Sequence, residues 1–124
     1  MKIAIHAGHN PDGKVACGAV GYGKESTLAR EVCAYLEEYL SPYADVFNVT
    51  CDDGANARDV LKKIIKKTNS ENPELSVSIH LNAESTHMAK GSEVWYYTGN
   101  PVTPYLGDEI CNELEKYGYR RGGG

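Results

Sequence analysis

Two histidines and a glutamate stand where a catalytic metal site could form. His9 begins a glycine-rich loop after the first predicted strand, and His80 lies near the end of the third. If these strands are parallel, both imidazoles lie at the carboxyl edge of the sheet, where open α/β folds place their sites. Glu25 follows the glycine-rich loop and immediately precedes a predicted helix, so its carboxylate can face the same edge. Two histidines and one glutamate form a donor set of catalytic zinc sites, which keep a fourth position open for water.

The spacing of these residues does not identify a metal site by itself, because the sequence has no HExxH or similar local signature. The two other histidines have simpler interpretations. His6 lies within a strand among apolar neighbours and is interpreted as a structural residue or as a support for the ligands. His87 lies in a polar loop and is expected to be exposed.

The elements that must position these side chains alternate between strands and helices. The pattern predicts strands at residues 2–7, 43–50, 75–81 and 92–98, and helices at residues 26–40, 56–68 and 104–117. Ser26 or Thr27 is expected to cap the first helix, and Thr103 with Pro104 to begin the last. This order predicts the α/β class, with a mostly parallel or mixed twisted sheet flanked by helices.

The composition is that of one acidic domain. The chain has 124 residues, which we expect to form a single domain, with 13 basic and 17 acidic residues and a net charge of -4. This balance argues against a nucleic-acid partner held by a basic face. We find neither a membrane-spanning apolar stretch nor a signal peptide, so we expect synthesis in the cytoplasm and no membrane insertion. The cysteines form no CxxC pair and are interpreted as free thiols: Cys17, Cys33, Cys51 and Cys111.

Four segments, in order, carry a resemblance to a known family: "MKIAIHAGHN", "GAVGYGKE", "SVSIHLNA" and "GSEVWYY". They resemble the landmarks of the zinc-dependent N-acetylmuramoyl-L-alanine amidases of the amidase type 3 family, over nearly the whole chain. His9, preceded by Gly8, matches the first zinc ligand, Glu25 the second and His80 the third. The resemblance implies a phosphorylase/hydrolase-like amidase fold that binds Zn²⁺. It also suggests Asn82 as a substrate-binding residue.

The chain departs from the family pattern at three places away from the ligands. The family usually has an aspartate at the position of His6, often an arginine at that of Cys51, and commonly an arginine where Ile64 and Ile65 stand. We expect these changes to affect packing and loop geometry.

A larger departure concerns the end of the chain. Members of the family continue beyond the Arg-Gly pair that Arg121 and Gly122 match, with a further helix, a strand and a catalytic glutamate. The resemblance therefore implies a C-terminally incomplete fold, whose open sheet edge would favour self-association. The general base is expected beyond Gly124, and neither Glu84 nor Glu93 is assigned that role.

The resemblance implies hydrolysis of the amide bond between N-acetylmuramic acid and L-alanine in peptidoglycan. The protein would act at the bacterial cell wall, as an endolysin or an autolysin. Two alternatives stay open. One is a catalytically impaired, zinc-containing module that only binds the cell wall. The other is a zinc peptidase, such as a carboxypeptidase, that acts on another amide bond.

Overall fold

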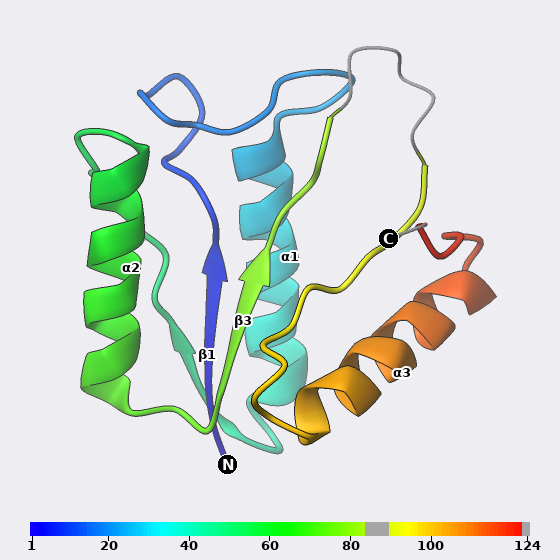
Figure 1. Cartoon of the computed structure of the whole chain (residues 1–124). Helices are drawn as coiled ribbons and strands as arrows, with labels where there is room; N and C mark the ends of the chain where they lie inside the picture. The colour runs from blue at the N-terminus through cyan, green and yellow to red at the C-terminus, as the bar shows by residue number, and fades with distance from the viewer. Residues whose placement is uncertain (84–89, 123–124) are drawn as a thin grey trace. The chain divides into compact units, whose positions relative to one another are not determined.

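The computed structural model describes residues 1–83 and 90–122. The chain divides into two compact units, Met1–Ala83 and Glu84–Gly124. The first unit contains β1 (Lys2–Ala7), α1 (Glu25–Leu40), β2 (Asp45–Asn48), α2 (Ala57–Glu71) and β3 (Leu75–Ile79), and the second contains α3 (Val102–Lys116) (Figure 1). That residues 1–124 form a single domain stays a prediction. Within the described ranges, no helix is both long and apolar enough to cross a membrane.

The sheet has three strands in the order β2-β1-β3, and both pairs are parallel. The α/β class predicted from the alternating elements is therefore confirmed. Ala7 at the end of β1 pairs with Ile79 at the end of β3, and the N–H of Gly8 donates to the carbonyl of Ile79 at 3.3 Å. The carboxyl ends of the two neighbouring strands thus lie side by side, as the parallel arrangement requires.

The central strand β1 is buried on both faces. Alternate residues of a strand point to opposite faces of the sheet. One set packs with α1 in a core of Ile3, Ile5, Ala7, Ala29 and Cys33. The other face of β1 packs with α2 in a core of Ala4, Val49, Cys51, Val60 and Ile64. The sheet is therefore covered by one helix on each face, and its edge at the strand ends is left for the loops.

The first helix begins without a side-chain cap. It starts at Glu25, and Lys24 at the N-cap position makes no side-chain hydrogen bond to the helix. The prediction that Ser26 or Thr27 caps this helix is therefore wrong. Ser26 lies inside the first turn and is only 1% exposed.

The other two helices also differ from the prediction at their ends. The helix predicted at 56–68 continues to Glu71, and Asn72 ends it in the left-handed conformation with φ of 49°. The last helix begins at Val102 rather than at Pro104, so Thr103 lies inside it and is not its cap. The Asn100 side chain accepts the N–H of Val102 at 2.9 Å and organises this earlier start.

The strand predicted at residues 92–98 does not form within the described part of the chain. Its only ladder contact there is an isolated bridge between Ser92 and Arg121. The alternation of the segment has another cause, since Val94 and Tyr96 approach Gly107 of α3 while Trp95 is 84% exposed. An alternating pattern can thus arise from packing on a helix, without a partner strand.

We predict that Ile5→Ala lowers the free energy of unfolding by about 3 kcal/mol, because Ile5 is fully buried in the central strand. The matched control is Ile65→Ala on α2, where the side chain is 48% exposed and the expected loss is below about 1 kcal/mol. Urea unfolding monitored by circular dichroism measures both. Equal losses in the two variants would contradict the description of the core.

Candidate metal centre

Three elements bring His9, Glu25 and His80 to the carboxyl edge of the sheet. His9 lies in the loop that follows β1, and His80 directly follows β3. Glu25 is the first residue of α1, at the end of the glycine-rich loop. Because β1 and β3 are neighbours in the sheet, the two histidines reach the same place from adjacent strands.

The Glu25 carboxylate lies between the two imidazoles. Its Oε1 atom is 3.3 Å from Nε2 of His9 and 3.0 Å from Nδ1 of His80. The two rings meet edge to face, with 5.0 Å between their centroids. One ligand atom from each of the three residues can be chosen so that all lie within 4.8 Å of one another. Two imidazole nitrogens and a carboxylate oxygen at this separation could hold a metal ion.

The backbone holds the Glu25 carboxylate in place. The N–H of Ala19 donates to Oε2 at 2.7 Å, and the N–H of Leu81 donates to Oε1 at 3.1 Å. Burial alone would raise the pKa of Glu25, but these backbone hydrogen bonds and the two imidazoles together keep that pKa below its usual value. The carboxylate is thus ionised at neutral pH although Glu25 is only 6% exposed. A buried negative charge between two imidazoles favours a bound cation.

Two glycines let the chain pass close to these side chains. A Cβ atom at Gly8 would overlap the imidazole of His80. A Cβ atom at Gly18 would lie 2.5 Å from Oε2 of Glu25 and 2.7 Å from Cδ2 of His9, and Gly18 also adopts a φ of +82°. Gly8 and Gly18 therefore leave the space that the side chains of the three candidate ligands occupy.

The open side of the centre is formed by the histidines. The side chain of His80 is 44% exposed and that of His9 is 29% exposed, whereas the Glu25 side chain is 6% exposed. The carboxylate is thus the buried member of the three, and the two imidazole rings are accessible to a molecule in solution.

His6 lies outside this group. It belongs to β1, and its Nδ1 atom is 3.4 Å from the hydroxyl oxygen of Ser78 on the paired strand β3. Burial lowers the pKa of His6, which favours a neutral ring. This placement agrees with its interpretation as a structural or supporting residue.

The remaining candidates are placed less centrally. Asn82 follows His80 closely and is exposed, and its role in substrate binding stays a prediction. Glu93 is an exposed residue of the second unit. Glu84 and His87 lie outside the described residues.

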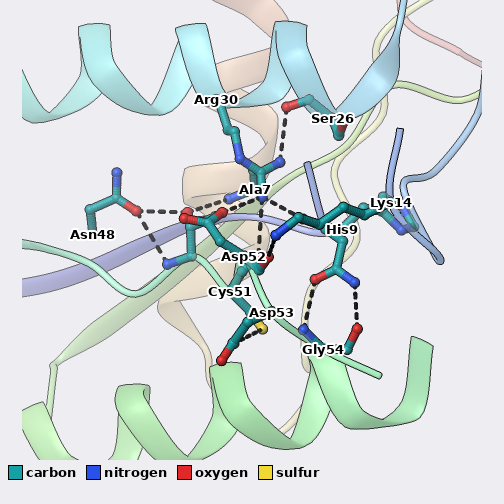
Figure 2. A network of polar contacts seen from close by, with 12 residues as sticks. Ala7, His9, Lys14, Ser26, Arg30, Asn48, Cys51, Asp52, Asp53 and Gly54 are labelled. Carbon is teal, nitrogen blue, oxygen red and sulfur yellow. Dashed lines mark hydrogen bonds and ion pairs between the residues drawn. The ribbon is translucent and has the colours of Figure 1, made fainter. Parts of the chain in front are cut away.

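Two residues around the centre were not identified from the sequence, Asn10 and Arg30. Asn10 is fully buried, and its side chain donates to the carbonyls of Val15 and Gly54 and accepts the N–H of Gly54. Arg30 reaches the carbonyl of His9 from α1 (Figure 2). The position of Asn10 directly after His9 was the only available signal for it, and no sequence signal pointed to Arg30.

A comparison with protein families agrees with the motifs. The family model described as N-acetylmuramoyl-L-alanine amidase matches residues 3–123, which is nearly the whole chain. No curated protein matches the chain.

We predict that Gly8→Ala weakens the binding of a divalent metal ion by at least about 10-fold, because the new methyl group must displace His80 from Glu25. The matched control is Gly21→Ala in the same loop region, where a Cβ atom has no neighbour within 4 Å. Titration calorimetry with Zn²⁺ measures both variants. Unchanged binding by a folded Gly8→Ala variant would show that His80 is not a ligand.

Proposed function

This chain belongs to the N-acetylmuramoyl-L-alanine amidase family, and we propose that it hydrolyses the amide bond between N-acetylmuramic acid and L-alanine with a zinc ion held by His9, Glu25 and His80. The observation that carries the proposal is the meeting of these three donors at the carboxyl edge of the sheet. The resemblance seen in the sequence motifs is confirmed by the family match. Peptidoglycan is the substrate of this family of amidases.

The donor chemistry supports zinc as the metal. Zinc in catalytic sites is commonly bound by histidine nitrogens and a glutamate oxygen, with one position left open. The three residues here offer such a set around a buried carboxylate. Bound zinc supplies a Lewis acid that makes water more acidic and polarises a carbonyl group.

The residues of the chain would contribute in three ways. Glu25 supplies a fixed negative charge, because backbone N–H groups orient both of its oxygens. Because Glu25 is only 6% exposed, water screens this charge weakly and it interacts strongly with a cation. His9 and His80 supply nitrogen ligands at the accessible side, so that a carbonyl oxygen of an extended substrate can approach there.

Asn82 is included in the proposal as a substrate contact. It is exposed and lies just beyond His80, and an amide side chain is of a type that binds glycan or peptide groups through hydrogen bonds. The proposal assigns no residue of this chain as the general base. It places the action of the protein at the bacterial cell wall, in lysis or remodelling of the endolysin or autolysin type.

We predict that the chain binds one equivalent of Zn²⁺ and releases peptides with a free N-terminal L-alanine from peptidoglycan. His9→Ala, Glu25→Gln and His80→Ala should each abolish stoichiometric zinc binding, because each removes one of three donors. His6→Ala is the matched control, since its ring lies outside the group and its loss should weaken binding only modestly. Metal analysis after dialysis and mass spectrometry of the digested muropeptides provide the measurements.

The outcomes separate the candidate functions. Equal zinc loss in His6→Ala and His9→Ala would show that the ligands are wrongly assigned. Stoichiometric zinc without cleavage of any muropeptide amide would favour the module that only binds the cell wall. Release of amino acids from the carboxyl end of the stem peptide would favour the peptidase.

A further inference from the structure

The guanidinium of Arg30 joins three segments of the first unit next to the metal centre (Figure 2). From α1, its Nη2 atom lies 2.8 Å from the carbonyl oxygen of His9 and 3.0 Å from that of Cys51. The same nitrogen is 2.7 Å from a carboxylate oxygen of Asp52. Nη1 donates to the carbonyl of Ser26 in the preceding turn of the helix at 3.1 Å. One planar group therefore connects α1, the loop after β1 and the loop after β2.

These contacts are stronger than those of an ordinary surface arginine. The Arg30 side chain is only 24% exposed, and Cys51 is fully buried. Hydrogen bonds from a charged donor are shorter and stronger than those between neutral groups. Arginine suits such a place because its donors form a rigid fork that a lysine lacks. Without this donor, the buried carbonyl of Cys51 would lose its charged partner.

The helix α1 therefore contacts His9 at two points. Glu25, at the start of the helix, faces the Nε2 atom of the His9 ring at 3.3 Å. Arg30, in the following turns of the same helix, binds the main-chain carbonyl of His9 at 2.8 Å. Both the ring and the backbone of His9 are therefore held by side chains of one helix, α1. This matters because His9 lies in a loop, where no strand pairing fixes its main chain.

We propose that Arg30 is a positioning residue for the metal centre, which sets the affinity for zinc by holding the main chain of His9 against α1. The inference rests on the proposed function, because it takes His9 as a zinc ligand. Among the hydrogen bonds and ion pairs of the described residues, Arg30 makes none with the ring nitrogens or the Glu25 carboxylate, so its effect is transmitted through the His9 backbone. Residues around the ligands of metal sites typically change metal affinity by about 10- to 100-fold when they are replaced.

The test compares Arg30→Met with Lys63→Met in the full chain. Methionine keeps an unbranched apolar stem but has no donor. Lys63 of α2 is the matched control. Its ammonium group donates to the Asp53 carbonyl at 2.9 Å, so it holds the loop after β2 that Arg30 also binds, but it makes no hydrogen bond to His9. Three quantities are measured: the Zn²⁺ dissociation constant in competition with a chromophoric chelator, the visible absorption of the Co²⁺-loaded protein, and the Tm of the metal-free chain.

We expect Arg30→Met to bind Zn²⁺ at least about 10-fold more weakly and to change the Co²⁺ absorption. Lys63→Met should stay within about twofold of the unmodified chain in Zn²⁺ affinity and keep its Co²⁺ spectrum. A purely structural role of Arg30 would lower the Tm and leave the Zn²⁺ affinity and the Co²⁺ spectrum unchanged below the transition. That result would overturn the inference while leaving the proposed function intact.

A second variant, Arg30→Lys, keeps the test decisive if Arg30→Met does not fold. Its single ammonium group can reach only some of the oxygen atoms that Arg30 binds. We therefore expect Arg30→Lys to bind Zn²⁺ more weakly than the unmodified chain. If Arg30→Met also folds, the affinity of Arg30→Lys should lie between those of Arg30→Met and the unmodified chain. An unchanged affinity and spectrum in folded Arg30→Lys would overturn the inference. If the unmodified chain binds no Zn²⁺, the proposed function fails, and the inference fails with it.

Discussion

The Glu25 carboxylate has to stay charged where water barely reaches it, and much of the surrounding structure meets that requirement. An ionised group removed from water is strongly disfavoured unless hydrogen bonds and opposite charges compensate for the lost hydration. Here the compensation comes from the backbone N–H groups of Ala19 and Leu81 and from two imidazoles. The first turn of a helix adds to it, because the N-terminal end of the helix dipole favours a negative charge.

This constraint explains the layout of the sheet edge. The loop before α1 must fold back so that Ala19 faces Glu25, which requires the left-handed turn at Gly18. The chain after β3 must bring Leu81 to the same carboxylate, which places the preceding His80 over Gly8, directly after the neighbouring strand β1. The strand order β2-β1-β3 lets the two histidines meet, because β1 and β3, which they follow, are direct neighbours in the sheet.

The parts of this arrangement that rest on side-chain type and periodicity were predictable from the sequence. The strands and helices of the first unit follow from apolar patterns. The three candidate ligands were singled out by residue types at strand and helix ends together with the resemblance of the surrounding motifs to the amidase family. The polar supports were not predictable, because Glu25 and Arg30 bind mainly to backbone groups, which every residue has. No residue type marks the carbonyl of His9 as an acceptor for Arg30. The strand expected at 92–98 failed for a related reason, since alternation shows which side chains are covered and not whether the backbone has a partner.

The two histidines of the centre are held in place by different means. His80 follows directly on a strand that is paired residue by residue with β1, so the sheet itself places its main chain. His9 lies beyond the last paired residue of β1, at the start of a long loop. Side chains therefore help to place its main chain, in addition to the backbone hydrogen bonds of Gly8 and Asn10 on either side of it. Arg30 binds the carbonyl of His9, and the Asn10 side chain binds Gly54. In this chain the loop side of the centre thus carries a network of polar side chains, whereas on the strand side sheet pairing, the Leu81 hydrogen bond to Glu25 and the space left by Gly8 position His80.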